Sequence, residues 1–213
     1  MKITLSGTLE PCYSCTTANA RRKNVAKGTK TVTTKIGEIA HYDVTSVRDE
    51  SFGGNKCWGM AVDAHSKQSS SHFVKTKDAV ENHVMAYLRK MHKDGTPVEI
   101  LRMDYGGENQ LIEQAIALDP LVTTKVQYTP RDSPQYNGIV ERKFAWLWHG
   151  VRSVLNQAKL PQSIQGKLWP EAARYVELVS NNIITPRKKD LGSPYQHFHG
   201  KEWESLDTSS PLE

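Results

Sequence analysis

The fold is decided by residues 77–103, which read KDAVENHVMAYLRKMHKDGTPVEILRM. Apolar residues first recur at helical spacing between Val80 and Met91, and then gather in one run over 97–103. Gly95 lies between the two patterns, where a helix can end on a left-handed residue. The stretch therefore predicts a helix followed by a buried strand, which is the alternation typical of an α/β protein.

Patterns on both sides of this stretch extend the same architecture. Short alternating runs separated by turn residues predict strands, and longer runs with helical spacing predict helices. The expected order is strands over 39–46, 57–64 and 72–75, the helix over 77–93, a strand over 97–103, a helix over 108–118, a strand over 122–128, and helices over 138–159 and 163–184. This order predicts a mixed five-stranded sheet flanked by helices.

The composition is that of a folded protein that stays in a reducing compartment. Hydrophobic residues make up 38% and charged residues 24% of the 213 residues, which favours a packed core. No apolar run approaches the roughly 18 residues of a membrane-spanning helix, and no signal peptide is recognisable. The cysteines, three in all, do not make a disulfide framework. We therefore expect no membrane association and a nuclear or cytoplasmic location.

The basic residues are concentrated at two places along the chain. The first 40 residues hold seven Lys or Arg against two acids, and residues 142–189 hold nine against two. The centre is acidic on balance. Two basic regions around an acidic centre favour a polyanionic partner such as nucleic acid, although any single cation has the alternative of a solvated surface charge.

Acidic residues stand at the ends of three predicted elements. Asp43 lies in the first strand, Asp104 ends the fourth strand, and Glu141 lies in the first turn of the helix over 138–159. If these carboxylates converge, their repulsion calls for a bound cation. Taken singly, Asp104 is also a good turn former and Glu141 a favourable charge at a helix start. Asp63 ends the second strand and is the rival for the first acid, but we interpret it as a turn residue.

Two motifs that contain Asp104 and Glu141 resemble the integrase core of copia-type retrotransposons, and Asp43 matches the first acid of that family. The motifs are RMDYGGEN over 102–109 and YTPRDSPQYNGIVERK over 128–143, and the resemblance continues through 151–161, 168–173 and 193–201. The 36 residues between Asp104 and Glu141 are close to the spacing in that family. The resemblance implies an RNase H-like fold and an Asp-Asp-Glu catalytic triad formed by Asp43, Asp104 and Glu141.

The resemblance also implies a chemistry and a set of partners. Carboxylate oxygens select Mg²⁺ or Mn²⁺, and two such ions support in-line displacement at phosphorus. The implied reactions are 3′-end processing of element DNA and strand transfer into target DNA, carried out by a homo-oligomer and associated in the family with virus-like particles. Expected DNA contacts, each with the alternative of a solvated helix face or a capping loop, are Arg142, Lys143, Arg152, Tyr136 and Asn137.

The expected domain organisation has three parts. Residues 1–37 are interpreted as a truncated zinc-module remnant followed by a basic linker, 38–190 as the catalytic core, and 191–213 as a polar tail. Cys12 and Cys15 have metal-ligand spacing, but tetrahedral zinc needs four ligands. We therefore expect no zinc to be bound by this pair alone.

Two other classes of function compete with the enzyme. One is a catalytically decayed or domesticated RNase H-like module that binds nucleic acid without cutting it. This alternative is favoured by Tyr105, because the resembling family usually has Asn after the second Asp. The other is a protein-interaction scaffold whose acids are surface charge only.

Overall fold

A computed structural model describes residues 32–129, 137–184 and 192–201 of the chain. The chain divides into two units, 1–31 and 32–213, and every described residue belongs to the second. The predictions for Cys12, Cys15 and Tyr136 therefore lie outside the described residues. Within the described ranges, no helix is long and apolar enough to cross a membrane.

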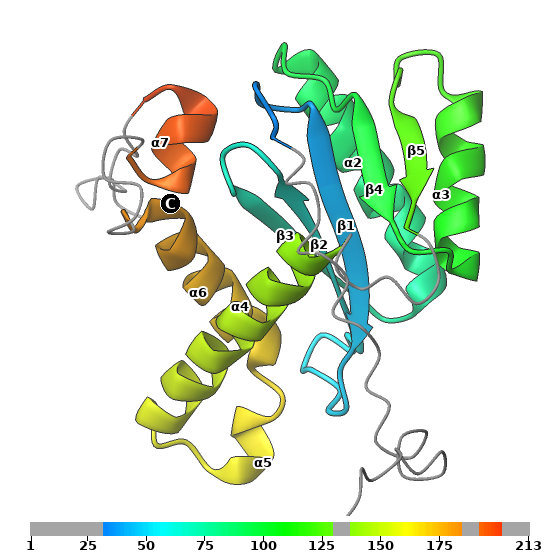
Figure 1. Cartoon of the computed structure of the whole chain (residues 1–213). Helices are drawn as coiled ribbons and strands as arrows, with labels where there is room; N and C mark the ends of the chain where they lie inside the picture. Colours follow the sequence, from blue (N-terminus) through cyan, green and yellow to red (C-terminus); the bar gives the residue numbers. More distant parts are fainter. Residues whose placement is uncertain (1–31, 130–136, 185–191, 202–213) are drawn as a thin grey trace, which may run out of the picture. The chain divides into compact units, whose positions relative to one another are not determined.

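The centre of the molecule is a mixed five-stranded sheet (Figure 1). Its strands, in chain order, are β1 (Ile39–Ser46), β2 (Cys57–Asp63), β3 (Ser69–Val74), β4 (Ile100–Met103) and β5 (Lys125–Tyr128). In space they lie in the order β3-β2-β1-β4-β5. β1, β2 and β3 pair antiparallel, whereas β4 is parallel to both β1 and β5. The mixed sheet predicted from the sequence is confirmed.

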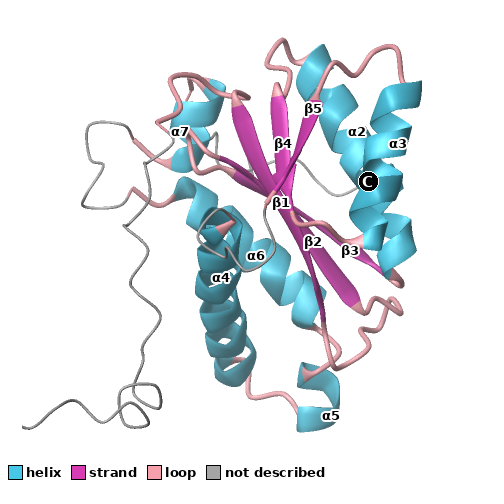
Figure 2. Cartoon of the chain, turned by 45° about the vertical axis from the view of Figure 1, so that its right-hand side comes forward, coloured by secondary structure: helices cyan, strands magenta, loops and turns pink. Residues whose placement is uncertain are grey.

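Helices cover both faces of this sheet (Figure 2). They are the short 3₁₀ turn η1 (Lys77–Ala79), α2 (Val80–Lys93), α3 (Gly107–Leu118), α4 (Gly138–Gln157), α5 (Gln162–Gln165), α6 (Trp169–Asn182) and α7 (Pro194–His199). α2 and α3 lie on one face, and α4 and α6 lie on the other. The result is a three-layer α/β/α arrangement with β1 in its middle.

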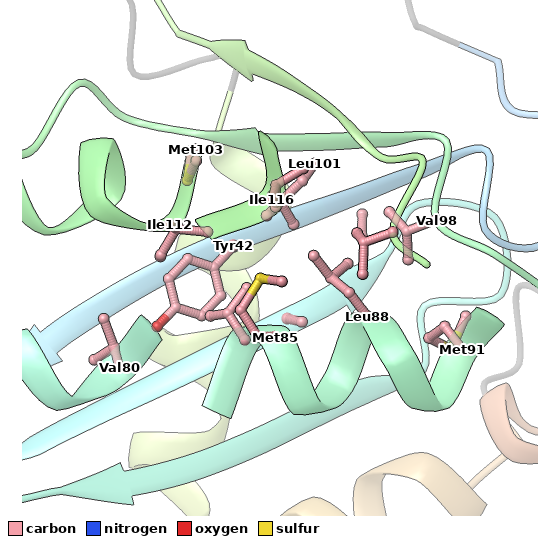
Figure 3. Packing of buried hydrophobic residues seen from close by; sticks show 14 of the residues in the cluster. Tyr42, Val80, Met85, Leu88, Met91, Val98, Leu101, Met103, Ile112 and Ile116 are labelled. Atoms are coloured by element: carbon pink, nitrogen blue, oxygen red, sulfur yellow. The ribbon is translucent and has the colours of Figure 1, made fainter. Parts of the chain in front are cut away.

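The first core fills the space between the sheet and the α2–α3 layer (Figure 3). Alternate residues of β1 point into it, and Tyr42 is 1% exposed there. Val80, Val84 and Leu88 present the buried face of α2, as their helical spacing predicts. Cys57 is buried in the same core, which fits its interpretation as a core residue.

The second core joins the opposite face of the sheet to α4 and α6 and is rich in aromatic rings. Trp58 of β2 is fully buried, and its ring centroid lies 5.3 Å from that of Phe144 and 5.0 Å from that of Trp148, both on α4. Trp169 of α6 completes the cluster 6.3 Å from Trp58. Edge-to-face contacts of this kind favour one arrangement of the rings. They therefore fix where α4 lies against the sheet.

Several segments differ from the sequence-based expectation, and β4 and β5 each begin three residues later than expected, at Ile100 and Lys125. The helix expected over 163–184 is two helices, because Pro170 lacks the N–H needed to continue a helix from α5 into α6. β3 begins at Ser69, three residues earlier than expected, because its pairing with β2 already starts at Val62 and Ser69. Inside the expected polar tail, α7 forms behind a capping box in which Ser193 caps the amide of Gln196.

Candidate active site

Asp43 lies in the middle of the sheet, on the side that faces α4. Its neighbours Tyr42 and Val44 pack into the α2–α3 core, so strand alternation turns Asp43 to the opposite face. The side chain is half-buried, and its Oδ1 accepts a hydrogen bond of 2.8 Å from the amide of Val44. An acid at this position gains nothing from packing, which is consistent with a functional reason for its presence.

The pKa of Asp43 is raised by burial and by neighbouring carboxylates. Burial raises the pKa of this carboxyl to about 6, and the negative charges of Asp104 and Glu141 push it in the same direction. The Val44 amide and the ammonium of Lys77 oppose the rise. The end of β4 and the start of α4 thus bring Asp104 and Glu141 close enough to β1 for their charges to act on Asp43.

Asp104 follows β4 directly and is exposed. Its Oδ1 and its backbone carbonyl both accept hydrogen bonds from Nδ2 of Asn109, which is buried in the first turn of α3. The carboxylate is therefore held at the end of the strand by the next helix. Tyr105, the residue that departs from the resembling family, is 53% exposed and packs its ring edge-on against Tyr128 of β5.

Glu141 lies exposed in the first turn of α4, and that end of the helix is tied to β1. The buried side chain of Asn137 makes the tie: its Oδ1 lies 3.3 Å from Nδ1 of His41, and its Nδ2 donates to the carbonyl of Tyr42 at 3.3 Å. These contacts place the start of α4 beside the strand that carries Asp43.

The carboxylates form an electrostatic cluster and not a closed metal site. Across the ranges 32–129, 137–184 and 192–201, no three His, Cys, Asp or Glu side chains are grouped so that they could hold a metal ion. Like charges repel when nothing lies between them, so an open cluster is what these carboxylates are expected to form by themselves. Their oxygens nevertheless suit a hard divalent cation.

The structure adds Lys77, which the sequence analysis did not single out. Its charge acts on the pKa of Asp43, and the charge of Asp104 in turn acts on that of Lys77. Its Nζ also pairs with Oε1 of Glu108 at 3.1 Å. In the sequence Lys77 is one lysine among many, and only its place just after β3 hints that it faces the cluster.

Asp63 occupies a different environment from the cluster. It is 1% exposed at the end of β2, and its Oδ2 accepts hydrogen bonds from the amide of Ser66 at 2.6 Å and from the Ser66 hydroxyl at 2.7 Å. The other oxygen accepts from the amide of Gly37 at 2.9 Å. Because its oxygens are used to build the turn after β2, Asp63 fits the interpretation as a turn residue.

The residues predicted to contact DNA lie in different settings. Arg142 and Arg152 are exposed on α4, and an Nη2 of Arg152 lies 3.2 Å from Nδ1 of His149. Lys143 is partly buried, and its Nζ donates to Oγ of Ser180 at 2.8 Å. Both ends of the Asn137 amide bind β1. Contact of these four residues with DNA stays a prediction.

Solved structures of viral integrases share this architecture. The HTLV-2 integrase catalytic core domain in complex with magnesium, in its trimeric form, aligns with a TM-score of 0.53 and 19% identity over 76% of this chain and 97% of that chain. The simian T-cell lymphotropic virus intasome in complex with the PP2A regulatory subunit B56 gamma aligns with a TM-score of 0.64 and 16% identity over 94% of this chain and 68% of that chain. The fold is therefore that of a retroviral-type integrase catalytic core, which is RNase H-like.

Sequence comparison points to one retrotransposon relative. The chain is 29% identical over 164 residues to the retrovirus-related Pol polyprotein from transposon TNT 1-94 of Nicotiana tabacum. This match includes 75% of the chain but spans only 12% of the length of that polyprotein. No family model matches the sequence. The chain is thus a distant homologue of this polyprotein, and the resemblance predicted from the sequence is confirmed at that level.

Proposed function

We propose that the chain is the catalytic core of an integrase that processes DNA 3′ ends and joins them to target DNA. The single observation that carries the proposal is that the charges of Asp104 and Glu141 both act on the carboxyl of Asp43 within an integrase-core fold. The expected division into a remnant with a basic linker over 1–37, the catalytic core over 38–190 and a polar tail over 191–213 is part of the proposal.

The chemistry of the donor set fits a divalent metal. One of the solved relatives is described as a complex with magnesium, and the three carboxylates offer the hard oxygen ligands that Mg²⁺ and Mn²⁺ prefer. Asp43, Asp104 and Glu141 would hold the ions. Ions held there would supply activation of an attacking oxygen and stabilisation of the charge on a leaving oxygen.

The remaining residues position the carboxylates and the DNA. Asn137 and His41 hold the start of α4, and with it Glu141, against β1. Asn109 orients the carboxylate of Asp104 through a hydrogen bond to Oδ1. Arg142 follows Glu141 directly and is exposed, so its guanidinium is placed to contact phosphate oxygens of a DNA end beside the cluster. Arg152 extends this basic face further along α4.

The partners in this proposal are element DNA, target DNA and further copies of the chain. One solved relative is an intasome and another is a trimeric integrase core, and both descriptions apply to those proteins. We extend DNA binding and homo-oligomerisation to this chain because its fold is the same and because the α4 surface carries exposed arginines beside the carboxylate cluster.

Strand transfer with a labelled DNA end in Mn²⁺ tests the proposal. The full chain should join the labelled strand to a target, and Glu141→Gln should lower the rate at least a hundredfold while binding of the same DNA is retained. Glu171→Gln is the matched control, because Glu171 is an exposed first-turn glutamate on a neighbouring helix, α6. Equal joining by the full chain and by Glu141→Gln would contradict the enzymatic proposal.

A binding module without turnover is the second candidate. It is favoured by the open carboxylate cluster within the described part of the chain and by the exposed Tyr105 next to Asp104. For this candidate, salt-sensitive DNA binding is expected without any joining in the full chain, with Glu141→Gln behaving like the parent. The strand-transfer experiment therefore separates the two candidates.

A further inference from the structure

A cavity separate from the carboxylate cluster lies between α4, α6, α7 and the turn that joins β2 to β3. Its volume is about 270 Å³, which is near the small end of the range for small-molecule sites. Lys143 and Glu141 both belong to α4, but two residues correspond to about 200° of helical rotation. The cavity therefore opens on another side of α4 from the proposed active site.

Lys143 brings a partly buried positive charge to the wall of this cavity. An ammonium group can donate three hydrogen bonds, and Ser180 is the one acceptor that Nζ has among the residues described. A desolvated cation with unused donors is costly unless an acceptor approaches it.

Glu177 does not fill the role of a direct counterion. Its two oxygens accept hydrogen bonds from the amide of Ser71 at 3.1 Å and from the Ser71 hydroxyl at 2.8 Å, so the carboxylate is bound to β3. In the part of the chain that the structure describes, no salt bridge joins Glu177 to Lys143. The side of the Lys143 ammonium that faces the cavity is therefore suited to an anion from outside the chain.

The rest of the cavity wall is suited to a flat apolar group. Trp146 is 50% exposed, and its ring centroid lies 5.9 Å from Nζ of Lys143. Ile183 and Pro194 add apolar surface from α6 and α7, and Lys67 adds a second positive charge from the β2–β3 turn. An indole face next to an ammonium matches a ligand that has a planar ring and a carboxylate.

We propose that this cavity is a binding site for a small aromatic carboxylate, with its carboxylate on Lys143 and its ring against Trp146. The ammonium supplies a charge-assisted hydrogen bond and the apolar wall supplies contact area for the ring. Binding here uses neither a metal nor the carboxylate cluster, so this proposal stands or fails separately from the proposed enzymatic function.

Calorimetric titration of the full chain with 2-naphthoate and with its neutral analogue 2-naphthamide tests this site. The carboxylate should bind at least tenfold more tightly than the amide. Lys143→Met should abolish that difference by weakening 2-naphthoate alone, whereas Lys125→Met, which removes an exposed lysine of β5, should leave both affinities unchanged. Equal affinities of 2-naphthoate for the full chain and for Lys143→Met, or no binding to any of the chains, would overturn the proposal.

A second variant covers the case in which Lys143→Met fails to fold. Trp146→Ala removes a half-exposed side chain, so the core is retained. It should weaken both naphthyl probes about tenfold, because both lose the ring contact, which corresponds to about 1.4 kcal/mol. Unchanged binding of both probes to Trp146→Ala would place them elsewhere and would equally overturn the proposal.

Discussion

Asp43 is the residue at which the proposed function conflicts with stability. Its carboxylate is half-buried in the central strand, and the charges of Asp104 and Glu141 add to the cost of ionising it. The pKa of about 6 expresses that cost. A protein selected for stability alone would place an apolar or amide side chain at this position.

Asp43→Asn should therefore stabilise the metal-free protein at neutral pH. The pKa of Asp43 is about 6 in the folded chain, against an unfolded value near 4, so the folded state binds the proton more tightly. The stability that comes from this proton is complete below pH 4 and is lost as the pH rises through 6. At pH 7.5 the amide variant should be more stable by about 2 to 3 kcal/mol.

Urea unfolding at several pH values checks this prediction. The advantage of Asp43→Asn should shrink as the pH falls from 7.5 and should vanish near pH 4. Asp49→Asn is the control, because Asp49 is an exposed aspartate in the connection between β1 and β2. A variant that is no more stable than the parent at pH 7.5 would show that the carboxylates do not act on Asp43 as described.

At the scale of the elements, α4 is the part of the molecule that has to be placed most accurately. Asn137 anchors its start to β1, and Gly150 allows its middle to approach α6 closely. A Cβ on Gly150 would lie 2.4 Å from Cγ1 of Val176, so the two helices meet where a side chain is absent. The anchor and the close crossing together set the position of Glu141.

Gly150→Ala should destabilise the protein, although alanine is the better helix former. Helix propensity alone would favour the variant by about 1 kcal/mol. Overpacking against Val176 costs about 1 to 3 kcal/mol in a tight interface and should outweigh that gain. Thermal unfolding of the variant should therefore occur below that of the parent.

Gly107→Ala is the matched control for this effect. Gly107 begins α3, and a Cβ there would meet nothing within 4 Å. This variant should be neutral or more stable. If Gly150→Ala were as stable as Gly107→Ala, the close crossing of α4 and α6 would not limit the packing.

β1 carries a buried histidine and β3 a partly buried one, and both make the sheet sensitive to acid. Burial lowers the pKa of His41 to about 4, and burial and His83 lower that of His72 to about 3. His72 is packed between Tyr42, whose hydroxyl lies 3.1 Å from its Nε2, and the parallel ring of His83 at 4.9 Å. Both imidazoles are neutral in the folded protein at neutral pH.

Acid should therefore destabilise the parent more steeply than His72→Gln. Because the folded pKa lies below the ordinary value, the stability contributed by neutral His72 is present above pH 6.5 and is lost as the pH falls toward 3. Each such histidine contributes a slope of up to about 1.4 kcal/mol per pH unit. Urea unfolding between pH 6 and pH 4.5 should show a slope smaller by that amount in His72→Gln.

An exposed histidine provides the comparison for this slope. His92 lies exposed near the end of α2, so His92→Gln should retain the acid sensitivity of the parent. Equal slopes for His72→Gln and for the parent would mean that His72 does not resist protonation in the folded chain.

At the scale of the whole molecule, the fold could be predicted from the sequence because burial imposes a readable period. β1 occupies the residues expected for it, Ile39–Ser46, and α4 begins at Gly138 as expected. The break before α6 was missed because hydrophobic spacing continues across Pro170, although a proline is typical of the first turn of a new helix. α7 was missed because Pro194–His199 is too short for a periodic signal.

The site could be predicted only in part. Asp104 and Glu141 stand out because each is an acid at an element end within a family motif, and Asp43 stands out as an acid inside a strand. The catalytic role of all three remains a prediction. Lys77 could not be found in this way, since its place beside Asp43 depends on the path of the chain after β3. Asn137 was found, but its hydrogen bonds to β1 depend on three-dimensional contacts and not on spacing.

Exposed arginines on α4 predict how the proposed DNA binding responds to salt. The logarithm of the binding constant for a duplex should fall linearly with the logarithm of the salt concentration, because protein cations that bind phosphates release counterions from the DNA. Arg142→Gln should reduce that slope by about one, whereas Lys93→Gln, at the end of α2 on the opposite face of the sheet, should not. Fluorescence anisotropy of labelled DNA at several salt concentrations measures the slope for each variant. Equal slopes for Arg142→Gln and for the parent would show that Arg142 does not contact DNA phosphates.

The aromatic cluster that joins β2, α4 and α6 gives the protein an optical reporter of its own. Trp58, Trp148 and Trp169 lie within 6.3 Å of one another, and two of them are almost fully shielded from water. Indole emission shifts to longer wavelength on contact with solvent, so lifting α4 away from the sheet would redden the spectrum. Whether the helix that carries Glu141 stays seated when a cation or DNA arrives can thus be followed without attaching any dye.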